Sequence, residues 1–291
     1  MEKKAFFEAI EKEVAAITAE PVKVMEVANS TKKYTGLVIG DAMALPVLCL
    51  DDWYERVDGF KTLSEMAEKI LLEYDAVITE HKGETQNVAG LVKDILMGSF
   101  DEVKDRLQVR LAGKAPEDLV TRDVLGMKAT CHVVLSAEND GAMISTPVNP
   151  AMLERWGVTA DELFEAGLAE TFKRTPITGK PVNDVLAECG MLPPETAAPL
   201  VPLNVLSVKG GVNGAVVLMD SDTLKSVYDT VGEYWVLPSS VHEVLYFKKN
   251  EADPADLKAM VMDVNRTCLK EGEFLSDNVF MYDGTELKIA A

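Results

Sequence analysis

The sequence predicts an α+β fold in which antiparallel sheets, built from hairpins and meanders, pack with amphipathic helices. Long segments carry apolar residues at helical spacing, whereas short apolar runs are separated by turn residues. Because helices and strands do not alternate strictly, an antiparallel arrangement is favoured over a doubly wound sheet. The 291 residues suffice for one continuous domain or for two α+β lobes, which we place at residues 1–98 and 99–291.

The N-terminal part predicts two helices around a small meander. Phe6, Ile10 and Val14 recur at helical spacing, which predicts a helix from Lys3 to Thr18. Three strand-like runs follow, at Val22–Ala28, Tyr34–Ile39 and Pro46–Leu50. Thr62-Leu63-Ser64-Glu65 has the form of a capping box and begins a helix whose apolar stripe we expect to cover the meander.

In the middle of the chain, strands are expected at Leu107–Leu111 and Thr130–Leu135, with Ala142–Ser145 as a hairpin partner. Asn149-Pro150 predicts a helix start, because asparagine caps well and proline suits the first helical position. A second capping box, Thr159-Ala160-Asp161-Glu162, begins the next helix.

The last third predicts further strands and two helices. The helices begin at Asp222 and at Asp253-Pro254. The strands are expected at Leu203–Val208, Ala215–Met219, Tyr234–Leu237, Val241–Phe247, Val279–Tyr282 and Glu286–Ile289. The glycine-rich run from Lys209 to Gly214 is interpreted as a hairpin turn. A phosphate loop would need Gly-Lys-Ser/Thr and a following helix.

Composition and charge exclude several classes of partner. The formal net charge of −19 repels phosphates and anionic lipids, so direct nucleic-acid binding is not expected. The apolar runs are strand-sized, and acidic residues interrupt the N-terminus early, so neither a membrane span nor a signal peptide is predicted. We therefore expect a cytoplasmic protein whose partner, if it has one, is another protein.

The cysteines and histidines do not form a recognisable metal or redox motif. The four cysteines lie far apart in sequence, and the histidines His81, His132 and His242 show no HExxH spacing. No metal and no cofactor are expected.

One short string has the residue types of acyl-transfer chemistry. Pro238-Ser239-Ser240-Val241-His242-Glu243 offers two hydroxyls, an imidazole and a carboxylate, so Ser239, Ser240, His242 and Glu243 are the candidate catalytic residues. No GxSxG elbow surrounds either serine. The alternative is a serine turn leading into a strand, with His242 on the same, buried face as Val244 and Tyr246.

A second string, Asp51-Asp52-Trp53-Tyr54, places acids beside aromatics directly after a strand. Such a combination recognises amines or sugars, so Asp51, Asp52, Trp53 and Tyr54 are the candidate binding residues. The alternative is that the aromatics anchor a strand-to-helix turn which the aspartates cap.

Several strings together resemble a family of uncharacterised proteins from anaerobic, Clostridia-type bacteria, known only as a domain of unknown function. They are Leu48–Tyr54, Trp156-Gly157-Val158 with Asp161–Phe164, Pro238–Glu243, and Met260–Asn265 with Leu275-Ser276-Asp277. The resemblance spans nearly the whole chain. It implies a bacterial, cytoplasmic protein and brings no activity, substrate or cofactor.

Three functions remain open from the sequence. A non-catalytic intracellular binding or interaction protein is favoured, because no intact catalytic motif accompanies the strong acidity. The first alternative is a hydrolase that uses His242 with Ser239 or Ser240. The second is an acidic inhibitor that mimics nucleic acid.

Overall fold

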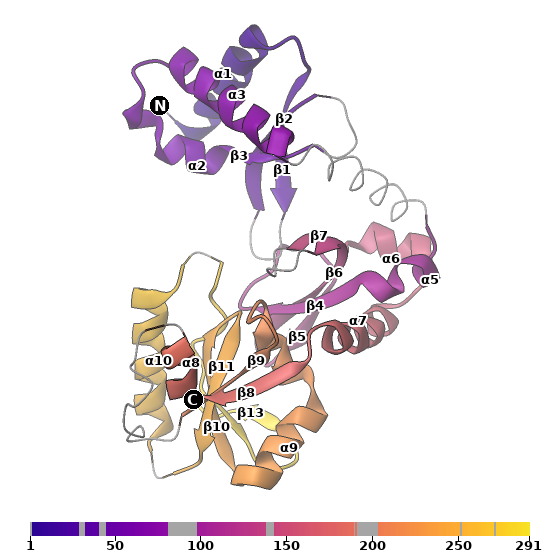
Figure 1. Ribbon diagram of the computed structural model, residues 1–291, viewed down its shortest axis with the longest axis vertical. Helices are drawn as coiled ribbons and strands as arrows, with labels where there is room; N and C mark the ends of the chain where they lie inside the picture. Colours follow the sequence, from indigo (N-terminus) through magenta and orange to yellow (C-terminus); the bar gives the residue numbers. More distant parts are fainter. Residues whose placement is uncertain are drawn as a thin grey trace. The chain divides into compact units, whose positions relative to one another are not determined.

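The computed structural model describes residues 2–28, 33–40, 45–80, 98–137, 143–188, 190, 203–250, 252–270 and 272–291 (Figure 1). The chain forms two compact units, Met1–Glu102 and Val103–Ala291. The expected boundary, between residues 98 and 99, falls just before this division. The described strands form three antiparallel sheets, which together with the helices confirm the α+β class.

The first unit is a three-stranded meander packed against helices. Strand β2 lies between β1 and β3, and α1 contacts α3 (Figure 1). The elements are α1 (Lys3–Ile17), β1 (Val22–Ala28), β2 (Lys33–Ile39), β3 (Leu48–Cys49), α2 (Leu50–Glu55), η1 (Val57–Gly59) and α3 (Leu63–Glu80). The predicted helix, meander and second helix are therefore confirmed, although the third strand is shorter than expected because α2 already begins at Leu50.

The core of this unit joins the two helices to β2. Phe6, Ile10 and Val14 of α1 are fully buried together with Ile70 of α3. The hydroxyl of Tyr74 donates to the Ile39 carbonyl at 2.9 Å and accepts from the Ile39 amide at 3.1 Å. Thr62 accepts from the Glu65 amide at 3.1 Å, as the cap motif predicts.

The second unit begins with a sheet in which β6 is central. β6 pairs with β4 on one edge and with β5 and β7 on the other. The elements are α5 (Phe100–Val103), η2 (Lys104–Arg106), β4 (Leu107–Ala112), β5 (Thr121–Val124), β6 (Met127–Ala137), β7 (Met143–Pro147), α6 (Pro150–Trp156) and α7 (Ala160–Arg174). Both predicted helix starts are confirmed, since Asn149 accepts from the Met152 amide and Thr159 forms a reciprocal capping box with Glu162.

The rest of the second unit is a six-stranded sheet of order β13-β12-β10-β11-β9-β8. Helix α10 packs on it through Leu257 and Val261, which join a core cluster with Trp235 and Leu237. The elements are β8 (Ile177–Pro181), α8 (Val182–Glu188), β9 (Asn204–Val208), η3 (Gly214–Met219), α9 (Ser221–Val231), β10 (Tyr234–Ser240), β11 (Glu243–Lys248), α10 (Pro254–Cys268), β12 (Phe280–Tyr282) and β13 (Leu287–Ile289).

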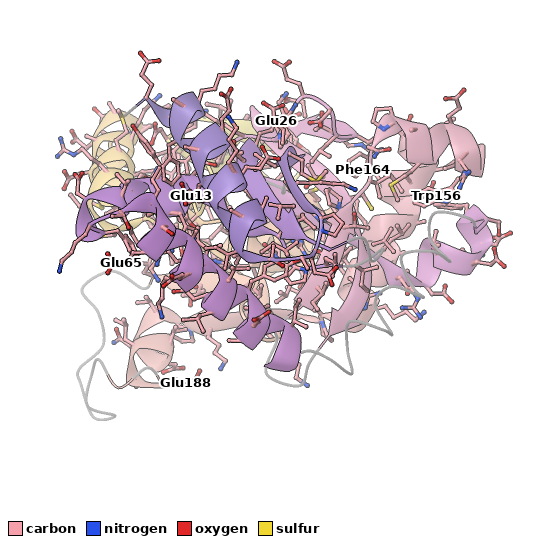
Figure 2. The ribbon with its side chains drawn as sticks, turned by 90° about the horizontal axis from the view of Figure 1, so that it is seen from above. Glu13, Glu26, Glu65, Trp156, Phe164 and Glu188 are labelled. Carbon is pink, nitrogen blue, oxygen red and sulfur yellow. The ribbon has the colours of Figure 1, made fainter. Side chains whose placement is uncertain are left out.

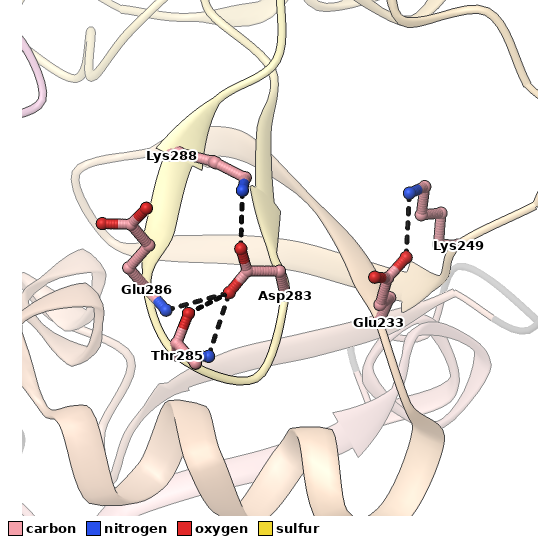
Figure 3. A network of polar contacts seen from close by, with 6 residues as sticks. All are labelled: Glu233, Lys249, Asp283, Thr285, Glu286 and Lys288. Atoms are coloured by element: carbon pink, nitrogen blue, oxygen red, sulfur yellow. Dashed lines mark hydrogen bonds and ion pairs between the residues drawn. The ribbon is translucent and has the colours of Figure 1, made fainter.

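The predicted C-terminal hairpin β12–β13 is confirmed, and Asp283 organises its turn (Figure 3). One carboxylate oxygen accepts from the amide and hydroxyl of Thr285 and from the amide of Glu286, while the other accepts from Lys288 at 2.5 Å. These bonds hold the pKa of Asp283 well below its usual value.

Three predictions for the chain between β9 and β11 are wrong. Residues 215–219 were expected to form a strand but lie in the 3-10 helix η3, so the glycine-rich run joins β9 to η3 and is not a hairpin turn. Pro238-Ser239-Ser240 belongs to β10, and the reversal comes at Val241-His242. These errors have local causes, because a short apolar run has no decisive period and Pro-Ser-Ser is common in turns. Elsewhere in the second unit, the sequence did not predict the strands β5 and β8.

Candidate functional site

The β10–β11 turn contains the candidate catalytic string, and hydrogen bonds to the main chain hold it. Ser240, at the end of β10, accepts from the His242 amide through Oγ at 3.0 Å. The Val241 amide donates to the Glu273 carbonyl at 2.9 Å, and the Val241 carbonyl accepts from the Ala215 amide at 3.2 Å. The turn is therefore tied both to η3 and to the segment after α10.

The imidazole of His242 points into this network. Its Nδ1 lies 3.2 Å from the Asn213 amide and accepts that hydrogen bond, so the neutral ring carries its proton on Nε2. Nε2 lies 4.0 Å from Oε1 of Glu273. The prediction that His242 shares a buried strand face with Val244 and Tyr246 is wrong, because His242 lies in the turn and its side chain is 37% exposed.

No serine hydroxyl is hydrogen-bonded to this ring among the residues that the structure describes. The hydroxyl of Ser240 is bonded to the main chain, and that of Ser239 donates to Oε1 of Glu243 at 3.4 Å. A serine nucleophile needs a base within hydrogen-bond reach to take its proton. With Nδ1 accepting and Nε2 protonated, the imidazole of His242 has no lone pair left for that task.

The residues of this site that were missed in the sequence include Ser207 on β9 and Gly214 at the start of η3, besides Asn213 and Glu273. The hydroxyl of Ser207 donates to the His242 carbonyl at 2.7 Å. A Cβ on Gly214 would stand 2.1 Å from Ser207 Oγ and 2.4 Å from the same carbonyl, so only glycine fits there. These contacts join segments about 30 residues apart, so no local sequence pattern predicts them.

The segment after α10 brings two of the resemblance strings together. Nδ2 of Asn265 donates to the Ser276 carbonyl at 2.9 Å and to Oδ1 of Asp277 at 2.8 Å. The Gly113 amide donates to the Phe274 carbonyl at 3.0 Å. The segment that carries Glu273 toward His242 is thus fixed at several points.

An open pocket of about 350 Å³ adjoins the turn. Its floor is formed by neighbouring strands: Thr178 of β8 pairs with Ser207 of β9, and the β9–β11 register places Glu243 beside Ser207. Glu188, at the end of α8 (Figure 2), pairs with Lys180 at 2.7 Å on the pocket wall. The other lining residues are Val185, Val205, Val208, Lys209, Gly210 and Gly211.

The candidate binding string lies in the first unit and is largely structural. Asp51 accepts from the Thr35 amide at 2.7 Å and pairs with Lys3 at 2.6 Å, which joins α2 to β2 and α1. Trp53 is 2% exposed in the core, with Arg56 stacked 4.0 Å from its ring centre. Tyr54 packs against Phe6 at 5.3 Å between ring centres, and Asp52 is exposed.

The structure therefore keeps the four residues of this string in one helix but assigns the aromatics to packing. The expectation that the aspartates cap the helix is wrong, because Cys49 holds the cap position and Asp51 and Asp52 lie in the first turn.

A buried polar cluster on the first sheet of the second unit was also missed. Gln108, Thr130 and His132 are almost fully buried, and the Arg110 guanidinium donates to Gln108 Oε1 at 3.2 Å and to Ser145 Oγ at 2.7 Å. Burial lowers the pKa of Arg110 to about 10. Burial and the nearby charge of Arg110 hold the pKa of His132 well below 6.5.

The described residues contain neither a cluster suited to a metal ion nor a helix suited to a membrane. No group of three or more His, Cys, Asp or Glu side chains in this part of the chain is placed to hold a metal ion. Likewise, none of the helices described is both long and apolar enough to cross a lipid bilayer.

Comparisons with known proteins place the chain in a family and go no further. Neither the curated proteins nor the solved structures include a match to it. One family model matches residues 3–284, nearly the whole length. The chain therefore belongs to the family of unknown function DUF5688.

Proposed function

We propose that this protein is a non-catalytic binding protein, and that the pocket beside the β10–β11 turn receives a small ligand. One observation carries the proposal. The polar groups of the Pro238–Glu243 string hold the turn against β9, η3 and the segment after α10, while an open pocket with polar and apolar walls lies next to them. Concave sites of this kind are the usual binding sites of small molecules.

The proposal includes a bacterial, cytoplasmic location. Cys49, Cys131 and Cys268 are free thiols, which suits a reducing compartment.

The hydrolase hypothesis receives less support than binding. It requires His242 to accept a proton from Ser239 or Ser240, whereas Nδ1 accepts from Asn213 and the serine hydroxyls have other partners. The nucleic-acid-mimic hypothesis rests on net charge alone. Carboxylates such as Glu13, Glu26 and Glu65 come from three different elements, α1, β1 and α3 (Figure 2).

The test combines a turnover assay with a binding assay on the full chain. A panel of chromogenic acyl esters is offered to the wild type, to His242→Ala and to Ser240→Ala, and we expect the same background rate from all three. In parallel, a library of small polar metabolites is screened by thermal shift. A ligand at about 100 times its Kd adds about 2.7 kcal/mol to the free energy of unfolding.

Ester turnover that disappears in His242→Ala would contradict the proposal. A metabolite screen in which no compound raises the melting temperature of the wild type would contradict it too, provided that no compound distinguishes the wild type from Lys180→Met or Thr178→Val.

A further inference from the structure

We propose that the ligand of this pocket is a free aliphatic α-amino acid, a small zwitterion with an apolar body. This inference rests on the proposed function and names the ligand class of the same site. It follows from the charges, the hydroxyl groups, the apolar surface and the size of the pocket.

The charged groups of the pocket leave one cation and one anion available. Lys180 and Glu188 pair with each other at 2.7 Å. Lys209 is exposed, and within the described part of the chain no carboxylate lies within 4.0 Å of its ammonium group. Among the same described residues, the carboxylate of Glu243 has one hydrogen bond, which is long, from the Ser239 hydroxyl at 3.4 Å. A ligand that carries both charges satisfies Lys209 and Glu243 together.

Ligands with one sign of charge fit this lining less well. An anion drawn to Lys209 meets the carboxylates of Glu188 and Glu243, and a cation drawn to Glu243 meets Lys209 and Lys180. Phosphate-bearing cofactors are disfavoured for the same reason, because they bring two or more negative charges to a pocket whose formal charges sum to zero.

The uncharged lining matches the remaining parts of an amino acid. Thr178 and Ser207 stand opposite each other on adjacent strands and present hydroxyl oxygens beside Glu243. Val185 of α8 lines the same pocket as Val205, which is on the same face of β9 as Ser207, and these two residues give an aliphatic side chain an apolar surface. A volume of about 350 Å³ is at the small end of ligand pockets, which suits a molecule of this size.

Isothermal titration calorimetry on the full chain tests this inference with L-leucine and two analogues of the same shape. Isovalerate lacks the ammonium group and isoamylamine lacks the carboxylate. We expect L-leucine to bind and each analogue to bind at least tenfold more weakly. Glu243→Gln and Lys209→Met should each weaken L-leucine binding at least tenfold.

The matched controls are Glu233→Gln and Lys249→Met, which break an exposed ion pair of 2.8 Å between the residue before β10 and the residue after β11, outside the pocket lining (Figure 3). Both should bind L-leucine like the wild type. A thermal melt of each variant verifies that it is folded before titration.

Equal binding of L-leucine and its analogues would overturn the inference, as would L-leucine binding that is insensitive to Glu243→Gln and Lys209→Met. If L-leucine does not bind, the ligand class is wrong. In that case the proposed binding function still stands when another metabolite binds and loses affinity in Lys180→Met, and it fails when none does.

Discussion

At the scale of single residues, the second unit buries an imidazole, that of His132, close to the guanidinium of Arg110. His132 lies in a sheet core beside Thr130, with Oγ1 of Thr130 3.2 Å from its Nε2, and its Nδ1 has no hydrogen-bond partner among the residues described. Such a ring is stable only in its neutral form, because protonation would bury a charge next to the Arg110 guanidinium. The stability of the fold should therefore depend on pH through His132.

The free energy of unfolding should therefore fall as the pH drops below 6.5. Because the pKa of His132 is depressed in the folded protein, only the unfolded chain takes up this proton below its unperturbed pKa of 6.5. The expected loss is about 1.4 kcal/mol per pH unit from this group. Urea unfolding of the wild type and of His132→Gln between pH 7.5 and 5.5 measures it.

The His132→Gln variant should lose this part of the slope, whereas His242→Gln, which retains His132, should keep it. Equal slopes in the wild type and in His132→Gln would show that His132 does not titrate as argued.

A second residue-scale prediction concerns Gly214. Its replacement by alanine forces a Cβ to within 2.1 Å of Ser207 Oγ, so the turn, β9 or η3 must shift. We expect Gly214→Ala to lower the free energy of unfolding by about 1–3 kcal/mol. Gly179→Ala is the control, because its Cβ would meet Leu206 at an ordinary 3.6 Å. Equal stability of the two variants would refute the close packing inferred for the turn.

At the scale of elements, the sequence predicts best where the signal is local. The caps at Asn149 and Thr159 lie within four residues of the groups they bond, and both are confirmed. By contrast, the sequence predicts a strand where η3 lies, because Ala215–Leu218 is a continuous apolar run whose period does not distinguish a strand from a helix. What fixes η3 is the contact of Gly214 with Ser207 and His242, which come from two other segments.

The same distinction applies to the candidate site. The string Pro238–Glu243 is visible in the sequence, whereas its partners Ser207, Asn213 and Glu273 are supplied by tertiary structure. The chemistry of the string depends on those partners, so residue types alone suggested a hydrolase that the geometry does not favour.

The capping box of α7 gives an element-scale prediction. Thr159→Ala removes the hydroxyl that accepts a hydrogen bond of 3.2 Å from the Glu162 amide, and it should lower the free energy of unfolding by about 1 kcal/mol. Thr230→Ala, which removes only an exposed hydroxyl bonded at 3.1 Å to the Ser226 carbonyl, should cost less than half of that. Chemical denaturation of both variants and of the wild type measures these two losses in the free energy of unfolding. A loss at Thr230 as large as at Thr159 would contradict the capping argument.

At the scale of the whole molecule, the chain consists of two units with separate cores. The cluster around Phe6 and Tyr74 lies wholly within the first unit, and the cluster around Trp235 and Val261 lies within the second. A unit that buries its own apolar surface is able to fold alone.

We therefore expect a fragment of residues 103–291 to unfold cooperatively on heating and to keep the circular dichroism of a folded α+β protein. A fragment of residues 127–291, which lacks β4 and β5, should not do so, because it loses two of the three partners of β6. Failure of the longer fragment to fold would show that the second unit depends on the first.

If Pro238–Glu243 is an architectural string in a binding protein, its serines should not react with a fluorophosphonate, which labels activated serines covalently. The full chain is incubated with the probe beside a known serine hydrolase and analysed by intact and peptide mass spectrometry. We expect no adduct on Ser207, Ser239 or Ser240, because Nδ1 of His242 already accepts from the Asn213 amide and the Oγ of Ser240 is bonded to the main chain. An adduct on any of the three that vanishes in His242→Ala would show the opposite and identify a catalytic serine.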